Sequence, residues 1–259
     1  MALNLSGKYR YISHLLSYYP DGLEILIKQR LLGKPVSQIR LRNGLIIRGA
    51  KNSLLVDVID EIFYRKGYTP KFLPIKSGDV VVDIGANVGV FGLFAASKGA
   101  GKIYAFEPLP NNASLIKINF KENNVPEPVV VQAAVTDKSG RARFYLGKSD
   151  PHGSLVKEGF RGKIEVSTLT LGSIISKYHL KKVDFLKIDA EGSEGKIVMS
   201  TPPEVWMKIR KVSLEYHDDM SPVKHEDLNK RFQRLGFKTR LTFDGSPFGY
   251  IYAWRTGQR

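Results

Sequence analysis

From Gly78 to its C-terminal end, the sequence alternates between short apolar segments, turns that contain glycine, and segments with helical periodicity. Apolar segments of this length, bounded by charged or turn residues, are typical of strands. Successive units of strand, helix and strand place their strands in parallel, with right-handed crossovers. The alternation therefore predicts an α/β fold built on a mostly parallel sheet.

The pattern predicts strands at 79–84, 103–106, 129–135, 142–146, 163–168, 183–188, 212–216, 237–242 and 250–255. It predicts helices at 88–98, 110–123, 171–178, after Gly192, and at 225–235. The last two strands are joined only by residues 244–247, which is too short for a crossover helix, so that pair should be antiparallel. Residues 136–170 interrupt the alternation, and we expect the loop 147–162 to border the active site.

The first part of the chain has a different pattern. Residues 3–33 show helical spacing that is interrupted at residues 20–22, which predicts two short helices. Residues 36–48 alternate around Asn43-Gly44, the signature of a tight β-hairpin. Residues 54–66 return to helical periodicity, and Pro70 and Pro74 follow. We therefore expect an N-terminal extension over residues 1–76 and a main domain over residues 77–259.

The amino-acid composition limits the classes of protein to which this sequence can belong. A chain of 259 residues with 42% hydrophobic residues can bury a full core. Cysteine is absent, which excludes disulfides, thiolate zinc sites and cysteine nucleophiles. The apolar runs are much shorter than the roughly 20 residues of a membrane-spanning helix, and the N-terminus lacks the order of a secretion signal. These features predict a cytoplasmic protein.

The charge is strongly positive and unevenly distributed. The formal net charge is +15, and residues 1–51 contain nine Lys and Arg against two acids, a local excess of +7. Such a surface attracts polyanions by long-range steering, although a solvated lysine-rich surface has the same composition. Arg40, Arg42 and Arg48 fall on the expected hairpin, where Arg40 and Arg42 share a face and could meet phosphates.

Residues 80–89 form an apolar strand followed by a turn with two glycines and then a helix. Gly85 allows a ligand to approach the backbone, and Gly89 allows the helix to pack near the strand. The dinucleotide spacing G-x-G-x-x-G is missing, which disfavours a phosphate cradle. Asp83 instead places a carboxylate at the strand end, where it can attract an ammonium group directly or through water. S-adenosylmethionine carries such a group, whereas NAD does not.

Glu107 ends the next expected strand, eighteen residues after Gly89. An acid at this position can accept hydrogen bonds from both ribose hydroxyls of an adenosine-containing ligand. Asp83 and Glu107 on neighbouring strands therefore predict a binding site for S-adenosylmethionine.

A second group of acids follows two later strands. Asp189 and Glu191 end one strand, while Glu215 and His217 end the next and point to the same face. If the two strands are parallel neighbours, the four side chains lie together at the carboxyl edge of the sheet. They could hold a divalent cation, Mg or Mn, through Asp189, Glu215 and His217, or provide a general base without metal. The alternative is structural: Asp189 and Glu191 would cap the following helix, and Glu215 and His217 would pair with each other.

The joint order of several segments resembles the FkbM-type family of S-adenosylmethionine-dependent methyltransferases over residues 36–255. The segments are DIGANVGVFGL, AFEPLPNNASLIKIN, QAAV, KIDAEGSE and LEYH. The resemblance implies a class I, Rossmann-like sheet of seven strands in the order 3-2-1-4-5-7-6, and methyl transfer to a hydroxyl. It implies cofactor contacts from Asp83, Gly85, Ala86, Asn87, Gly89, Glu107, Pro108, Ala133, Ala134 and Asp189, with the two alanines beside the adenine.

The acceptor remains open at this point. A hydroxyl-bearing small molecule is the leading interpretation, with Asp189, Glu191, Glu215 and His217 as catalytic candidates and Ser154 in the insertion loop as a substrate contact. The first alternative is an RNA methyltransferase in which the basic N-terminal region binds RNA. The second is a noncatalytic module that keeps the cofactor pocket.

Overall fold

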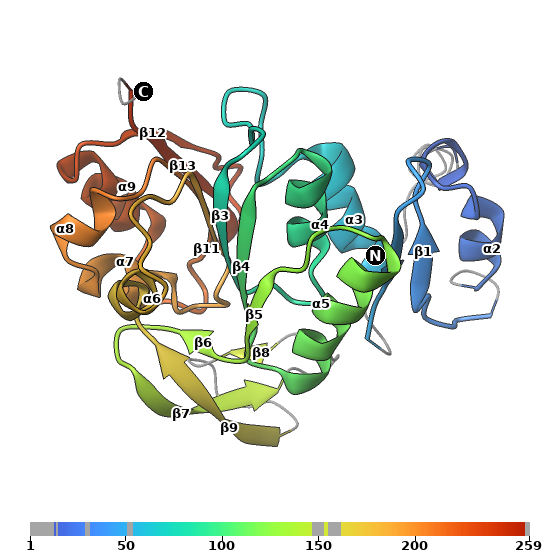
Figure 1. Cartoon of the computed structure of the whole chain (residues 1–259), viewed down its shortest axis with the longest axis horizontal. Coiled ribbons are helices and arrows are strands. Elements are labelled where there is room, and N and C mark those ends of the chain that lie inside the picture. Colours follow the sequence, from blue (N-terminus) through green and yellow to red (C-terminus); the bar gives the residue numbers. More distant parts are fainter. Residues whose placement is uncertain are drawn as a thin grey trace.

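A computed structural model describes residues 13, 15–28, 32–50, 54–146 and 162–256, together with the backbone of residues 153 and 154. A seven-stranded sheet in the order β12-β13-β11-β10-β3-β4-β5 forms its centre (Figure 1). The strands are β3 (Val80–Ile84), β4 (Lys102–Phe106), β5 (Val129–Val131), β10 (Phe185–Ile188), β11 (Lys211–His217), β12 (Lys238–Leu241) and β13 (Phe248–Trp254). Only β13 runs against its neighbours, so the expected sheet order and antiparallel last strand are confirmed.

Helices cover both faces of the sheet, which makes three layers (Figure 1). One face carries α3 (Leu55–Ile59), the π-helical η2 (Asp60–Arg65), α4 (Val90–Ser97) and α5 (Pro110–Glu122); the other carries α6 (Leu171–Lys177), α7 (Glu194–Ser200), α8 (Pro203–Trp206) and α9 (His225–Arg234). Successive strand residues point to opposite faces, so Val81 belongs to the first hydrophobic core and Val82 to the second. The short α8 carried no sequence signal that we used.

Local sequence fixes where several of these helices begin. Pro110 occupies the first turn of α5, where its fixed φ suits a helix and no N–H partner is needed. Thr170 and Ser173 form a reciprocal capping box at the start of α6. Gly89 precedes α4 with φ 87°, and a Cβ there would lie 3.2 Å from Ile116, so this close approach of α4 to α5 requires glycine.

The insertion between β5 and α6 forms a second, four-stranded sheet in the order β6-β9-β7-β8. Its strands are β6 (Ala134–Val135), β7 (Gly140–Leu146), β8 (Gly153–Ser154) and β9 (Gly162–Leu169). The expectation of one strand over 129–135 was therefore wrong, because the chain leaves the main sheet after Val131 and pairs with β9 from Ala134. Most of the expected loop 147–162 lies outside the described residues.

The N-terminal part contains α2 (Gly22–Leu26) and a hairpin of β1 (Gln38–Arg40) and β2 (Ile46–Arg48), as expected. Gly44 alone supplies the positive φ of the turn, at 89°. Buried residues of this part, such as Ile47 and Val56, share one hydrophobic cluster with Val81 and Phe91 of the main domain. The domain boundary expected near residue 76 stays a prediction. The segments on its two sides pack against each other in this cluster.

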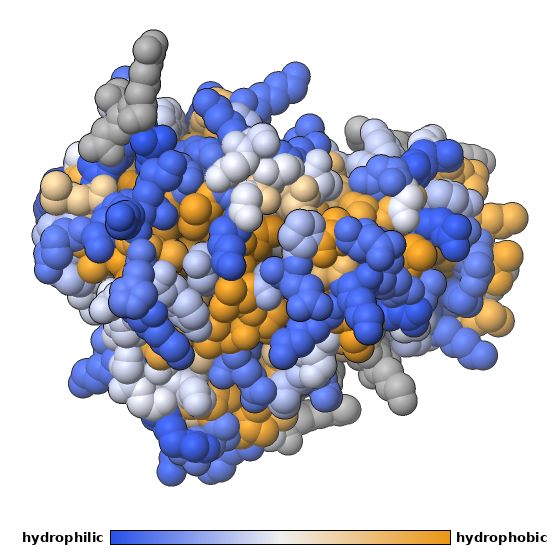
Figure 2. Space-filling model, in the orientation of Figure 1, coloured by the Kyte–Doolittle hydropathy of each residue, from blue (hydrophilic) through white to orange (hydrophobic). Residues whose placement is uncertain are grey.

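Two of the three arginines expected to meet a polyanion already contact protein groups. Arg42 donates hydrogen bonds to the backbone oxygens of Ser17 and Leu16, and Arg48 forms a bidentate pair with Glu122. Arg40 is exposed on β1. Figure 2 shows hydrophilic residues over most of one face but hydrophobic ones around α2 at its right-hand end, where Leu23 is 59% exposed. This end is therefore not uniformly basic.

Within the described residues, no helix combines the length and the apolar character that a membrane crossing requires.

Candidate functional site

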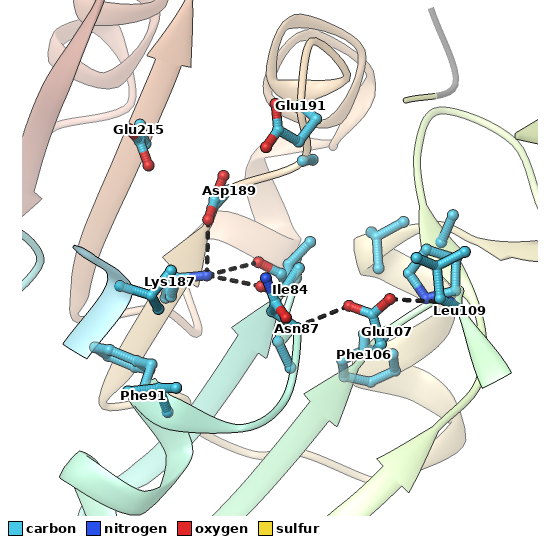
Figure 3. Close-up of a pocket in the computed structure, with 18 of the residues that line it drawn as sticks. Ile84, Asn87, Phe91, Phe106, Glu107, Leu109, Lys187, Asp189, Glu191 and Glu215 are labelled. Atoms are coloured by element: carbon cyan, nitrogen blue, oxygen red, sulfur yellow. Dashed lines mark hydrogen bonds and ion pairs between the residues drawn. The ribbon is translucent and has the colours of Figure 1, made fainter. Parts of the chain in front are cut away.

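A cavity opens at the carboxyl ends of β3, β4, β10 and β11, the edge at which open α/β sheets bind ligands (Figure 3). Most of the residues singled out from the sequence line it: Gly85, Ala86, Asn87, Glu107, Pro108, Ala133, Ala134, Asp189, Glu191, Glu215 and His217. Asp83 and Gly89 lie outside this lining. The predicted cofactor and catalytic groups thus face one shared space.

The turn after β3 exposes backbone to the cavity. Gly85 has φ 73°, and a Cβ on it would lie 1.8 Å from the carbonyl oxygen of Asp189, so only glycine lets these two strand ends approach. Asn87 also adopts a positive φ, 50°, which asparagine tolerates better than most residues. The turn therefore has the shape that a closely packed ligand needs.

Glu107 faces the cavity from the end of β4. Its Oε2 accepts the Asn87 N–H at 2.8 Å and its Oε1 accepts the Leu109 N–H at 2.9 Å, contacts that are drawn in Figure 3. Burial raises the pKa of Glu107 to about 7, against the opposing effect of these backbone hydrogen bonds. Oε1 also has a longer contact from Asn112 Nδ2, at 3.5 Å, whereas Oε2 keeps a further lone pair, so the group can still accept a hydrogen bond from a ligand.

Asp83 meets an ammonium group of the protein itself. It is fully buried, and Lys187 Nζ lies 3.3 Å from its Oδ1. The same Nζ donates to the carbonyl of Gly85 at 2.9 Å and to Asp189 Oδ2 at 3.3 Å. Asp83 lies outside the cavity lining and is linked to it through Lys187, which joins the end of β3 to the end of β10 (Figure 3). The expected contact of Asp83 with the cofactor, direct or through water, stays a prediction.

Tyr68 lies between the carboxyl groups of Asp189 and Glu215 at the ends of β10 and β11. Its hydroxyl donates to Asp189 Oδ2 at 3.0 Å and to Glu215 Oε2, although a single proton serves one carboxylate at a time. Burial opposes ionisation of Asp189, but Lys187 and other partners outweigh it and hold its pKa below the usual value. Burial, followed by the charges of Asp189 and Glu61, raises the pKa of Glu215 to about 8. Two carboxyl groups side by side thus differ in proton affinity.

His217 is held by Glu194, which sequence analysis left without a role. The His217 Nδ1 lies 3.1 Å from Glu194 Oε1, and Glu194 also accepts the N–H groups of Ala190 and Gly192. Burial alone would lower the pKa of His217, but the hydrogen bond to Glu194 and the neighbouring carboxylates outweigh it and raise the pKa to about 10. An imidazole that keeps its proton at neutral pH is poorly suited to act as a base.

The three residues expected to hold a metal also come together. Asp189, Glu215 and His217 each offer one ligand atom, and these atoms lie within 4.8 Å of one another. Their present partners compete with a cation: the ammonium of Lys187 lies 3.3 Å from Asp189 Oδ2, and His217 would have to lose its proton. The donor set therefore fits a divalent cation incompletely.

Besides Glu194, four residues of this region had no role predicted from the sequence. Glu61 and Tyr68 line the cavity from the N-terminal part, Lys187 lines it from β10, and Tyr250 of β13 donates a hydrogen bond to Glu61. Lys187 carried a usable signal, because a lysine inside an otherwise apolar strand must find buried partners. Arg40, Arg42 and Arg48 lie away from the described cavity lining, and only the backbone of Ser154, paired with Tyr145, is described.

Comparisons with known proteins agree on one family. A family model described as "Methyltransferase FkbM domain" matches residues 83–239. The 31-O-demethyl-FK506 methyltransferase FkbM of Streptomyces tacrolimicus is 29% identical over 215 residues, which cover 71% of this chain and 82% of that protein. The methyltransferase sdnD of Sordaria araneosa is 26% identical over 191 residues, covering 61% of this chain and 73% of the relative.

A solved structure resembles the chain in fold. The crystal structure of methyltransferase FkbM from Methylobacillus flagellatus KT superposes with a TM-score of 0.52 at 16% identity. The match covers 76% of this chain but only 48% of that one, so the present chain spans about half of its length.

Proposed function

Because the chain belongs to the FkbM-domain family of S-adenosylmethionine-dependent methyltransferases, we propose that it transfers the methyl group to a hydroxyl of its acceptor. One observation carries the proposal. The candidate cofactor residues Gly85 and Glu107 open onto the same cavity as the carboxylates of Asp189 and Glu215. Transfer to a hydroxyl needs both a methyl donor and a proton acceptor within one enclosed space.

The cofactor half of the cavity has groups that suit S-adenosylmethionine. Glu107 would accept hydrogen bonds from the ribose hydroxyls, and Ala133 and Ala134 would lie against the adenine. The backbone of the turn at Gly85 and Asn87 would approach the amino-acid end. When bound, the cofactor supplies an electrophilic methyl group on its sulfonium.

The acceptor hydroxyl must attack in line with the bond that breaks. A new bond forms between its oxygen and the methyl carbon, the carbon–sulfur bond breaks with its electron pair going to sulfur, and the hydroxyl proton passes to a base. Asp189 and Glu215 are the candidates for that base, because both line the cavity and His217 keeps its own proton at neutral pH. Asp189 is ionised at neutral pH, whereas Glu215, with a pKa of about 8, can accept the proton only in its ionised fraction, which grows as the pH rises through about 8. Tyr68, hydrogen-bonded to both carboxylates, would keep them oriented.

A metal-assisted route is the alternative for the same reaction. A divalent cation held by Asp189, Glu215 and His217 would polarise the acceptor hydroxyl and ease its deprotonation. The competing positive charge of Lys187 disfavours this route. Transfer that is abolished by a chelator and restored by magnesium or manganese would establish it instead of the plain base.

The base assignment is tested by single substitutions. We expect D189N and E215Q each to reduce turnover by about 100-fold or more, the usual contribution of a positioned base, and to reduce turnover more than affinity for S-adenosylhomocysteine. H217Q should reduce turnover less. E204Q, on the exposed side of α8, is the control for removing a carboxylate. Unchanged turnover in D189N, E215Q and H217Q would refute the assignment of the base. If wild type bound the cofactor but transferred no methyl group, the noncatalytic alternative would be favoured.

A further inference from the structure

Part of the cavity wall comes from segments outside the family match: Glu61, on η2, and Tyr68 line the cavity and precede residue 83. Tyr250 and Tyr252 of β13 follow residue 239 and contact this part of the chain through hydrogen bonds to Glu61 and Gly67. Relatives that share the matched domain need not share this wall. The wall is therefore where features particular to this chain's acceptor would be found.

Tyrosine hydroxyls hold this wall in a fixed position. Tyr250 donates to the carboxylate of Glu61, and Tyr252 donates to the backbone oxygen of Gly67 at 2.6 Å. The rings of Tyr68 and Tyr250 pack edge to face with centroids 5.3 Å apart. Tyr250 is also the cross-strand partner of Glu215. These contacts connect Glu61, through Tyr250, to Glu215, one of the candidate bases.

The polar groups around this space are mainly hydrogen-bond acceptors. Carboxylates come from Glu61, Asp189, Glu191 and Glu215. Among the described lining residues the cations are Lys187, which is engaged by Asp83, Asp189 and the Gly85 carbonyl, and His217, which is engaged by Glu194. Burial and the charge of Asp189 raise the pKa of Glu61 to about 7 and that of Glu215 to about 8, so at neutral pH Glu61 is partly ionised and Glu215 is mostly protonated, while Asp189 is ionised. A hydroxyl or ammonium group of a ligand would find acceptors here, whereas a phosphate or carboxylate would face the negative charge of Asp189 and Glu61.

We propose that Glu61 determines acceptor specificity: it accepts a hydrogen bond from the methyl acceptor and selects neutral or cationic, hydroxyl- or amine-bearing molecules over anionic ones. The inference rests on the methyl transfer proposed above and names the class of molecule for that same site. Like charges brought together at an interface strongly oppose binding, so this wall would discriminate by repulsion as well as by attraction. It therefore favours a small neutral or cationic acceptor over RNA.

The test supplies isotope-labelled S-adenosylmethionine and extract from the source cells to the full-length protein. Products are separated on an anion exchanger at neutral pH and identified by the mass of the labelled methyl group. Wild type and the control E204Q should label molecules that the exchanger does not retain. E61Q should yield roughly tenfold less product, because it binds the acceptor more weakly. Its unfolding and its affinity for S-adenosylhomocysteine should be unchanged. A more concentrated extract, which supplies more acceptor, should restore the yield of E61Q.

Y250F provides an independent variant, since it removes the hydroxyl that holds Glu61 and leaves the carboxylate in place. We expect it to lose product in the same direction as E61Q. Label in retained molecules or in RNA, or equal yields from E61Q and wild type, would overturn the inference while leaving methyl transfer intact. Absence of any labelled product from wild type would remove the proposed function and this inference together.

Discussion

Glu107 is the side chain on which the proposed cofactor contact depends most directly, because it is buried at the end of β4 and faces the cavity. Replacing it by alanine removes the acceptor of two ribose hydroxyls and of the Asn87 and Leu109 N–H groups. We expect E107A to weaken binding of S-adenosylhomocysteine by about 1.5 to 3 kcal/mol. Calorimetry measures this, with E204A as the exposed control. Unchanged affinity would refute the ribose contact.

The same residue predicts a pH dependence. Burial raises the pKa of Glu107 to about 7, so the carboxylate is largely protonated below that pH and accepts fewer hydrogen bonds. The ionised form should bind the ribose better, and affinity for S-adenosylhomocysteine should therefore rise as pH increases through about 7 and level off above it. E107Q cannot ionise and should give a flat profile between pH 5 and 9. A flat wild-type profile would contradict the assignment.

At the scale of the elements, β3 and β10 are joined by a buried ion pair. Asp83 and Lys187 are direct partners in the parallel register, and both side chains are almost completely buried. K187M would leave the Asp83 carboxylate buried without its partner, at a cost of about 3 to 5 kcal/mol in the free energy of unfolding. The double variant D83N/K187M removes both charges, so we expect it to be more stable than K187M. Denaturant unfolding tests this order, and a double variant less stable than K187M would argue against the pairing.

The sequence predicted those elements whose signal is local. The strand before Gly85, the acid at the end of β4 and the acids after β10 and β11 follow from strand length and turn chemistry alone. The split of 129–135 could not be predicted, because a single polar residue, Gln132, interrupts the apolar residues and one polar residue does not end a strand. The tertiary pairing of Ala134 with β9 separates it from Val131 in the main sheet. Glu61 and Tyr250 come from opposite ends of the chain, and nothing near either residue indicates that they meet.

At the scale of the whole molecule, the positive charge still allows a polyanion to bind, and Arg40 gives the cleanest test. Arg42 and Arg48 have structural contacts, so their substitution would disturb the fold as well as the surface. If RNA bound through residues 1–51, the logarithm of its affinity would fall steeply with the logarithm of the salt concentration. In that case R40E, which removes one phosphate contact, would reduce the slope by about one. We expect R40E to change neither the slope nor methyl transfer. A reduced slope together with lost transfer would favour the RNA alternative.

The cavity at the carboxyl edge of the sheet brings the residues proposed to bind the cofactor and those proposed to accept a proton into one space, which is the arrangement that methylation of a hydroxyl requires. The most direct measurement is transfer of an isotope-labelled methyl group from S-adenosylmethionine to molecules in cell extract, followed by nuclear magnetic resonance of the labelled product. We expect a methyl carbon bonded to oxygen, formed by wild type and nearly absent with D189N or E215Q. A methyl group on nitrogen or carbon, or equal transfer by both variants, would contradict it.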